Sequence, residues 1–391
     1  MQKIYLKQGR ERPVLNGHPW IFSGAVERIE GDVESVGIAD VFDGKKNWLA
    51  RGFYNPKSQI RVRLLTWQKE DIDGNFFARR IGQAFATRQV HLAASTNAYR
   101  IVNGEGDFLP GLIVDRYGDF LVCQFLAAGM ARFKDDIVEA FGPLLPVAGI
   151  FERSEGRVGN EEGIEATAGV LRGEAPPEAV LIEENGYKFL VDIRRGQKTG
   201  FFLDQRDSRV FLSTVVQERT FLNCFSFTGA FSVYAFGGGA KEVVTLDSSM
   251  AALQLAEKNL EVNGFAEAPG ELLKGDAFAY LKEIDRKFDV IVLDPPSLAH
   301  KRSDIDAATG GYKFLNLHAL RHLNTGGSLL TFSCSQHLSI DLFQKVIFGA
   351  AVDAERKVTV IKRLSQPLDH PFSLHHPEGE YLNGLALAAL D

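Results

Sequence analysis

The stretch "RTFLNCFSFTGAFS" (219–232) predicts how the C-terminal half of the chain folds. Its first part is a short apolar run, which is typical of a buried strand, and its last part favours a helix. The loop between them ends at Gly229. A glycine at this point lets backbone amides approach a ligand closely, because it has no side chain. The stretch is therefore typical of the first strand, loop and helix of a ligand-binding α/β sheet.

Strands and helices are expected to alternate along the rest of this half. Further apolar runs read "EVVTLD" (242–247), "FDVIVLD" (288–294) and "GSLLTFSCS" (327–335). The stretches 229–238, 249–264 and 311–324 have helical patterns. Such alternation, with nearly continuous apolar strands, predicts a parallel sheet covered by helices on both faces. We therefore expect an α/β, Rossmann-like domain over residues 184–391.

The residues directly after each strand are the candidates for binding a cofactor, because ligands bind beyond the carboxyl ends of such strands. Asp247 lies nineteen residues beyond Thr228, where an acidic side chain holds a ribose hydroxyl. Asp276 is placed to bind an adenine amino group. The candidate cofactor residues at these strand ends are Asn223, Phe225, Ser226, Thr228, Gly229, Asp247, Ser248, Asp276, Ala277, Asp294 and Pro295.

The glycines of the first loop favour S-adenosylmethionine over NAD. Dinucleotide enzymes carry G-x-G-x-x-G, whose second and third glycines serve a pyrophosphate and tight helix packing. This loop lacks those two glycines, and a nucleoside without phosphates does not need them. The glycines of "FGGGAKE" lie at the end of a predicted helix and are interpreted as its C-terminal cap. We predict no metal site.

The sequence "DPPS" (294–297) places a carboxylate and two prolines at a strand tip. The prolines stiffen the backbone, so that Asp294 can hold a planar base by its ring edge. Many nucleic-acid methyltransferases that modify exocyclic nitrogens have an aromatic residue after the two prolines. Ser297 stands there in this chain, which makes amino-group methylation less favoured.

Cys334 ends the last predicted strand, between Ser333 and Ser335. Carbon-5 of cytosine or uracil becomes nucleophilic when a thiolate adds to carbon-6. Cys334 is the candidate nucleophile, Asp294 the candidate acid near ring N3, and the two serines are candidates for stabilising the thiolate. The alternative is a buried core cysteine, which is the commoner role and the one that we expect for Cys123 and Cys224.

Residues 1–70 contain short alternating runs separated by turn residues, which is the pattern of a small β-barrel. They hold twelve Lys/Arg and eight Asp/Glu, a net charge of +4, so the remainder carries −10. Arg51, Arg61 and Arg63 share this segment with several aromatic residues, a combination that suits RNA binding. Packing of those aromatic residues in a small core is an equally weighted alternative.

Residues 71–183 predict a central α+β domain without recognisable chemistry, with a helix from about residue 75 and a hairpin around "YGD" (117–119). The composition, 45% hydrophobic and 24% charged over 391 residues, is typical of a soluble protein of two or three domains. Three cysteines argue against a disulfide framework. With no apolar run of about 18 residues and no signal-peptide core, we expect a cytoplasmic protein without a membrane partner.

These motifs resemble a known family. The stretches "NGYKFLVDIRRGQKTGFFLDQRDSR" (185–209), "LNCFSFTGAFS", "VIVLDPPS" and "TFSCS" are similar to those of bacterial 23S rRNA cytosine-5 methyltransferases of the large-subunit methyltransferase I group. The resemblance implies a PUA barrel, a central α+β domain and a class I methyltransferase fold. It also implies that "KTGFFLDQR" lies over the cofactor, which adds Lys198, Thr199, Gly200, Phe202, Asp204, Gln205 and Arg206, with Gln205 near the methionine end of the cofactor.

The resemblance therefore implies an S-adenosylmethionine-dependent enzyme that methylates carbon-5 of a cytosine in 23S rRNA, with Cys334 as nucleophile and Asp294 as acid. Other RNA cytosine-5 methyltransferases have a second cysteine where Ser297 stands, so product release is expected to use another base or water. Methylation of another position, such as a guanine nitrogen, and a non-catalytic role in RNA binding or ribosome assembly are the alternatives. The nucleotide, the form of the RNA substrate and the oligomeric state, including a homodimer, are left open.

Overall fold

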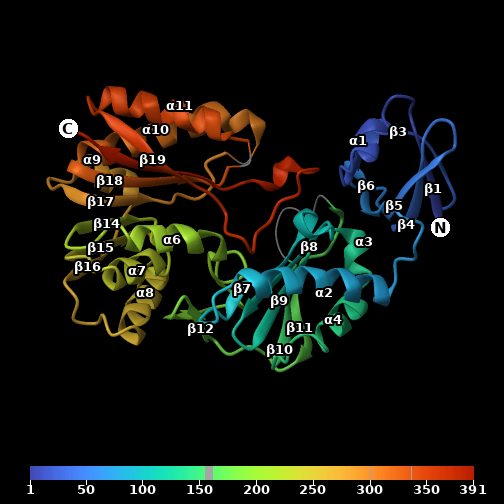
Figure 1. Ribbon diagram of the computed structural model, residues 1–391, viewed down its shortest axis with the longest axis horizontal. Helices are drawn as coiled ribbons and strands as arrows, with labels where there is room; N and C mark the ends of the chain where they lie inside the picture. The colour runs from blue at the N-terminus through green and yellow to red at the C-terminus, as the bar shows by residue number, and fades with distance from the viewer. Residues whose placement is uncertain (155–161, 300, 336) are drawn as a thin grey trace. The chain divides into compact units, whose positions relative to one another are not determined.

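The computed structural model describes residues 1–154, 162–299, 301–335 and 337–391. The chain forms two compact units (Figure 1). The first consists of Met1–Ile182, Val191–Leu203 and Leu368–Gly379. The second consists of Glu183–Leu190, Asp204–Pro367 and Glu380–Asp391. Each unit is therefore assembled from segments that lie far apart in the sequence.

The N-terminal part of the first unit is a six-stranded sheet of order β2-β6-β5-β4-β1-β3. Strand β1 pairs parallel with β4, and the other pairings are antiparallel. Alternate residues such as Ile4, Val41 and Val62 are buried in one core, as the period-two pattern predicts. The elements are β1 (Gln2–Leu6), α1 (Arg12–Leu15), β2 (Trp20–Phe22), a 3-10 helix (Ser23–Ala25), β3 (Val26–Glu30), β4 (Gly37–Phe42), β5 (Trp48–Tyr54) and β6 (Ile60–Thr66).

The central part of the first unit is a five-stranded sheet of order β11-β10-β9-β8-β7, and α2 lies across it (Figure 1). Asp73 caps this helix by accepting a hydrogen bond from the Phe76 amide at 2.9 Å, and Phe76, Phe77 and Ile81 are buried. The elements are α2 (Gly74–His91), β7 (Ala98–Asn103), a 3-10 helix (Gly104–Asp107), β8 (Leu112–Tyr117), β9 (Phe120–Phe125), α3 (Ala128–Ala131), α4 (Lys134–Phe141), β10 (Gly149–Ser154) and β11 (Thr167–Gly173).

The segment Leu368–Gly379 belongs to the first unit although it lies near the C-terminus. The buried Arg88 donates a hydrogen bond to the carbonyl of Asp369 at 3.0 Å, and Arg88 also pairs with Asp107. The Asp369 carboxylate accepts a hydrogen bond from the Arg100 amide at 2.9 Å. These buried polar contacts hold the segment on the central sheet.

The second unit contains a seven-stranded sheet of order β16-β15-β14-β17-β18-β20-β19. All neighbouring strands are parallel except β20, which runs antiparallel to β18 and β19. The strands expected at "RTFLNCFS", "EVVTLD", "FDVIVLD" and "GSLLTFSCS" are β14 (Thr220–Cys224), β15 (Glu242–Asp247), β17 (Phe288–Leu293) and β18 (Leu323–Ser333). The others are β16 (Gly270–Lys274), β19 (Val358–Leu364) and β20 (Asn383–Ala389).

Helices cover both faces of this sheet, as the alternating pattern predicts (Figure 1). One face carries α9 (Ala277–Glu283), α10 (Ile305–Arg321) and α11 (Ile340–Asp353), and the other carries α6 (Arg206–Ser213), α7 (Ala230–Gly237) and α8 (Met250–Val262). The remaining elements are the ladder of β12 (Val180–Glu184) with β13 (Tyr187–Val191) and 3-10 helices at Leu203–Gln205, Arg302–Asp304 and Pro377–Gly379. The α/β fold class expected from the sequence is confirmed.

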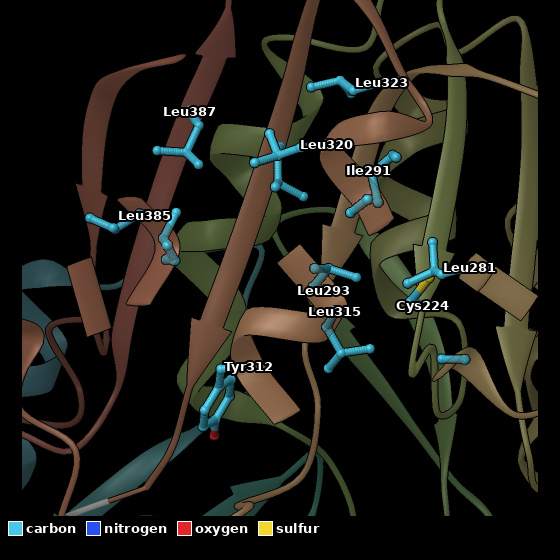
Figure 2. Close-up of a cluster of buried hydrophobic side chains, with 14 of the residues drawn as sticks. Cys224, Leu281, Ile291, Leu293, Tyr312, Leu315, Leu320, Leu323, Leu385 and Leu387 are labelled. Carbon is cyan, nitrogen blue, oxygen red and sulfur yellow. The ribbon is translucent and has the colours of Figure 1, made fainter. Parts of the chain in front are cut away.

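The core under α9, α10 and α11 is mostly aliphatic. Figure 2 shows Leu281, Ile291 and Leu315 from a helix, a strand and a second helix packed together, with Cys224 beside them. Tyr312 lies at the end of this cluster, and its phenolic oxygen points away from the leucines (Figure 2). The strand order reverses between β14 and β17, and this is the point in an α/β sheet where ligands bind.

Candidate active site

The loop after β14 has an unusual backbone. Phe225, Phe227 and Gly229 have φ angles of 60°, 49° and 75°, so two bulky residues adopt a conformation that costs on the order of 1 to 3 kcal/mol each. Asp247, at the end of the neighbouring β15, accepts hydrogen bonds from the amides of Phe227 and Ser249, both at 2.8 Å. Its carboxylate thus holds the loop in place and keeps lone pairs for a ribose hydroxyl.

Gly229 is required where it lies. A Cβ atom on this residue would be 2.8 Å from the Cβ of Ala256 in α8, and its φ is positive. The loop and α8 therefore approach more closely than any residue with a side chain would allow. This close approach is the reason for the single glycine that the sequence shows in this loop.

Several buried polar atoms around the loop have no hydrogen-bond partner among the described residues. These are Oδ1 of Asn223, Oγ of Ser226 and Oγ1 of Thr228, on side chains that are 0%, 6% and 4% exposed. Buried polar atoms normally have partners, so the loop fits a ligand that offers hydrogen bonds. The same loop carries the strained backbone, and the residues present therefore fit a nucleoside cofactor such as S-adenosylmethionine.

The residues after β15 and β16 occupy positions at the same edge of the sheet. Asp276 caps α9 by accepting a hydrogen bond from the Ala279 amide at 2.9 Å, which leaves its second oxygen for the expected adenine contact. Ala277 is buried next to it, whereas Ser248 is exposed. The cofactor roles of these three residues stay predictions.

Asp294 and Cys334 follow adjacent parallel strands, because Leu293 of β17 pairs with Thr331 of β18. The Cys334 sulfur lies 4.0 Å from the carbonyl oxygen of Pro295, the residue after Asp294. Gln205 donates a hydrogen bond from Nε2 to Oδ1 of Asp294 at 3.0 Å. The fold thus brings together the candidate nucleophile, the candidate acid and an amide that holds the acid.

The contact of Gln205 with Asp294 was not found by sequence reasoning, which expected Gln205 near the methionine end of the cofactor. The Gln205 side chain is 2% exposed, and its Oε1 atom has no partner among the described residues. Eighty-nine residues separate it from Asp294. The "DQR" motif was the available signal, but it does not indicate which carboxylate the amide binds.

The three cysteines differ in their surroundings. Cys123 and Cys224 are completely buried, and this burial raises the pKa of both thiols far above the ordinary range. Cys334 is only partly buried. Since the thiolate is the reactive form, Cys123 and Cys224 fit the core role expected for them, and Cys334 is the accessible thiol at the candidate site.

The serines beside Cys334 do not have the contacts expected of groups that stabilise a thiolate. Ser333 donates a hydrogen bond to the Tyr312 hydroxyl at 3.0 Å, and the Ser335 hydroxyl lies 3.1 Å from those of both Tyr312 and Ser297. Both serines are fully buried. Their hydroxyl groups are therefore engaged with other hydroxyls of the same unit.

Four of the expected cofactor residues, Lys198, Thr199, Gly200 and Phe202, belong to the first unit. Thr199 is buried, and its hydroxyl contacts Tyr117 at 2.7 Å and the Asp115 carboxylate at 2.6 Å. The Lys198 ammonium lies 4.5 Å from the centre of the Phe202 ring. These contacts explain the conformation of the stretch within its own unit, and its cofactor role stays a prediction.

The three arginines expected to bind RNA make internal contacts. Arg51 pairs with Asp40 at 2.9 Å, and Arg63 pairs with Glu162 at 2.9 Å and Glu105 at 3.3 Å. Arg61 donates hydrogen bonds to the carbonyls of Asn55 and Pro56. Their guanidinium groups therefore stabilise the N-terminal sheet and its neighbours, and an RNA role for them stays a prediction without a contact that supports it.

A cavity of about 370 Å³ lies on the N-terminal sheet. Its walls include Arg10, His18, Trp20 and Phe22. The Phe22 ring stands edge-on to that of Trp20, with centroids 6.2 Å apart, and Phe22 is 51% exposed. An exposed aromatic ring next to a cation is the combination that single-stranded nucleic acids bind.

Comparison with known families identifies the class of protein that this fold and site represent. A model of the S-adenosylmethionine-dependent methyltransferases matches residues 161–373, and a model of PUA-like domains matches residues 4–67. The protein is therefore an S-adenosylmethionine-dependent methyltransferase with an N-terminal PUA-like domain.

No helix within the described residues is long and apolar enough to cross a membrane.

Two relatives named ribosomal RNA large subunit methyltransferase I match almost the whole chain. The protein of Aliivibrio fischeri (strain MJ11) is 46% identical over 388 residues, which cover 98% of each chain. That of Tolumonas auensis is 44% identical over 393 residues, covering 99% of each. The structure of SMU.776 complexed with SAH matches with a TM-score of 0.87 and 25% identity, over 99% of this chain and 100% of the other. The chain belongs to the ribosomal RNA large subunit methyltransferase I family, as the resemblance predicts.

Proposed function

We propose that this enzyme methylates carbon-5 of a cytosine in 23S rRNA through a covalent adduct with Cys334. The observation that carries the proposal is the partly exposed Cys334 beside Asp294, at the ends of adjacent strands and within one unit. The names of the relatives support the RNA class. The strained loop and the orphaned polar atoms support binding of the cofactor in the same unit.

The proposed reaction starts when the Cys334 sulfur forms a bond with C6 of the cytosine. Asp294, as the neutral acid, gives its proton to ring N3, which accepts the electron pair displaced by the attack. Bound S-adenosylmethionine supplies the methyl group that C5 then takes. Loss of the C5 proton to water breaks the C6–S bond and restores the thiolate, and N3 returns its proton to Asp294. Gln205 keeps Asp294 oriented throughout by its hydrogen bond.

A tritium-release assay tests the position of methylation. RNA made with [5-³H]cytidine should release one tritium into water for each methyl group that it takes up from S-adenosylmethionine. RNA labelled at C8 of guanosine serves as the control and should release none. Methyl incorporation without release of tritium from C5 would place the reaction on another atom, such as a guanine nitrogen.

We propose that the cavity on the PUA-like domain binds an unpaired base of the RNA. Arg10 is available as the cation, and the exposed Phe22 ring as the surface on which a base stacks. The segments 1–70 and 71–183 would then position the RNA, and residues 184–391 would carry the chemistry. A cytoplasmic location stays a prediction of the sequence.

Replacement of Phe22 with alanine should weaken RNA binding roughly tenfold, because stacking of a base on an aromatic ring contributes about 1 to 3 kcal/mol. The measurement is the Kd for a 23S rRNA fragment at fixed salt. Phe348→Ala is the matched control, because Phe348 is a phenylalanine on α11 that is 69% exposed. Equal Kd values for the two variants would exclude the cavity as a base-binding site.

A further inference from the structure

Ser333 and Ser335, the two neighbours of Cys334, belong to a chain of hydrogen-bonded hydroxyl groups. Ser333 donates to Tyr312 at 3.0 Å, and the Tyr312 and Ser335 hydroxyls are 3.1 Å apart. Ser335 and Ser297 are also 3.1 Å apart, and Ser297 donates to the carbonyl of Ala299 at 3.0 Å. The chain therefore connects the strand that carries the nucleophile to the loop that follows Asp294.

The hydrogen atoms of this chain can be assigned. Each hydroxyl has one proton to donate, and Ser333 uses its proton toward Tyr312. Tyr312 then donates to Ser335, Ser335 to Ser297, and Ser297 to the Ala299 carbonyl. Tyr312, Ser333 and Ser335 are fully buried, so the hydrogen bonds among these three residues are shielded from water, whereas the two bonds of Ser297 are only partly buried. None of these four hydroxyl groups therefore has a proton left to donate to a Cys334 thiolate.

We infer that Tyr312 is the positioning residue of the nucleophile, an inference that rests on the proposed function. Its single oxygen contacts the residues on both sides of Cys334, so the backbone at Cys334 is fixed from both flanks. Through Ser335 and Ser297 the same oxygen is connected to the loop after Asp294. Tyr312 thereby sets the distance between the sulfur that attacks C6 and the carboxyl group that protonates N3.

Tyr312 acts from α10, and its ring is held independently of its hydroxyl group. The ring packs edge-on against Phe343 of α11, with centroids 5.5 Å apart. Replacement with phenylalanine therefore removes the hydrogen bonds and keeps the ring. Ser297 gains a role as well: it ends the hydroxyl chain, in the position after the paired prolines.

The test compares Tyr312→Phe with wild type in turnover and in the rate of adduct formation with RNA that contains 5-fluorocytosine. Both rates should fall on the order of 10²-fold, since misplacement of a reacting atom by about 1 Å costs that much. The KM for RNA and the affinity for S-adenosylhomocysteine should stay within about twofold of wild type, because no group that binds either ligand is removed. Ser333→Ala should produce a similar loss, and the double variant should lose no more than the single ones, because all act through one chain.

Tyr234→Phe is the control for lost stability. Tyr234 is a 1% exposed tyrosine of the same unit, and its hydroxyl contacts the Glu184 carboxylate at 3.0 Å. This variant should melt earlier and keep the wild-type turnover number. If Cys334→Ala is inactive but a folded Tyr312→Phe enzyme has wild-type rates, the inference about Tyr312 is overturned and the proposed function stands. A Cys334→Ala enzyme that still methylates RNA would instead overturn the proposed function, and the inference with it.

Discussion

Replacement of Cys334 with alanine is expected to lower methyl transfer by ~10⁴-fold or more, because no other group can form the bond to C6. Cys123 and Cys224 are buried with raised pKa values and cannot substitute. The loss should appear in the turnover number. The affinity for S-adenosylhomocysteine should be unchanged, because the orphaned polar atoms that fit the cofactor lie at the end of β14 and in the loop after it.

The adduct with 5-fluorocytosine RNA shows directly whether Cys334 is bonded to the base. Fluorine at C5 cannot leave as a cation in place of the proton, so the C6–S bond cannot be broken after methyl transfer. Wild type should therefore form a protein–RNA adduct that survives denaturation, and Cys334→Ala should form none. Cys123→Ala, which removes a buried thiol from the first unit, should form the adduct at the wild-type rate.

Methyl transfer by Cys334→Ala at the wild-type rate would give Cys334 the same structural role as Cys123 and Cys224. The site would then hold the base by Asp294 alone, and the chemistry would belong to an atom that needs no covalent activation. Methylation of a guanine nitrogen predicts this result, and it also predicts that the tritium-release assay finds no tritium released from C5 of cytidine. The two measurements therefore test the same mechanism at different atoms, sulfur and C5.

The strand ends could be predicted from the sequence because parallel strands bring their carboxyl ends to one edge. That rule places Asp247, Asp276, Asp294 and Cys334 near one another without knowledge of any contact. It also uses only local patterns, apolar runs followed by polar residues. The fold class and the edge that carries the candidate site are therefore available from the chain alone.

The partners of these residues could not be predicted, because they come from distant positions. Gln205 reaches Asp294 across 89 residues, and Tyr312 reaches Ser335 from the interior of a helix whose pattern indicates only a buried face. The partners of the arginines in the N-terminal segment could not be predicted for the same reason. Arg63 has the sequence context of an RNA-binding residue, but its ion pairs with Glu105 and Glu162 depend on the packing of segments far from it.

Strand order also depends on more than local pattern. The last strand, β20, inserts between β18 and β19, and it runs antiparallel to both. Five of the seven residues of β20 are buried, as expected for a strand with neighbours on both sides. An apolar run near a C-terminus indicates a strand, but it does not indicate where in the sheet that strand pairs.

Replacement of Asp294 with asparagine is expected to lower the turnover number by about 10² to 10⁴-fold, the usual contribution of a general acid. Asparagine has the same shape, and its amide oxygen can still accept the hydrogen bond that Gln205 donates to Oδ1 at 3.0 Å. What it lacks is a proton that can be transferred to N3. The folded structure and the place of the side chain should therefore persist while the chemical step fails.

Asp289→Asn supplies the matched control, because Asp289 lies on β17, the strand that Asp294 follows. Asp289 accepts hydrogen bonds from Thr220 and Asn324 at 2.8 to 2.9 Å near the opposite end of β17. Its replacement should lower the melting temperature and leave the turnover number unchanged. Asp289→Asn should therefore lose stability but keep its turnover number, whereas Asp294→Asn should keep its stability but lose turnover.

Adduct formation with 5-fluorocytosine RNA separates the two roles that Asp294 can have. If it protonates N3, addition of the sulfur to C6 is slow without it, and Asp294→Asn should form the adduct as slowly as it turns over. If it only holds the base by its ring edge, the asparagine amide can also hold N3 by donating a hydrogen bond, and the adduct should form at close to the wild-type rate. Because attack at C6 displaces an electron pair onto N3, we expect the first result, with the rates of adduct formation and turnover reduced by the same factor.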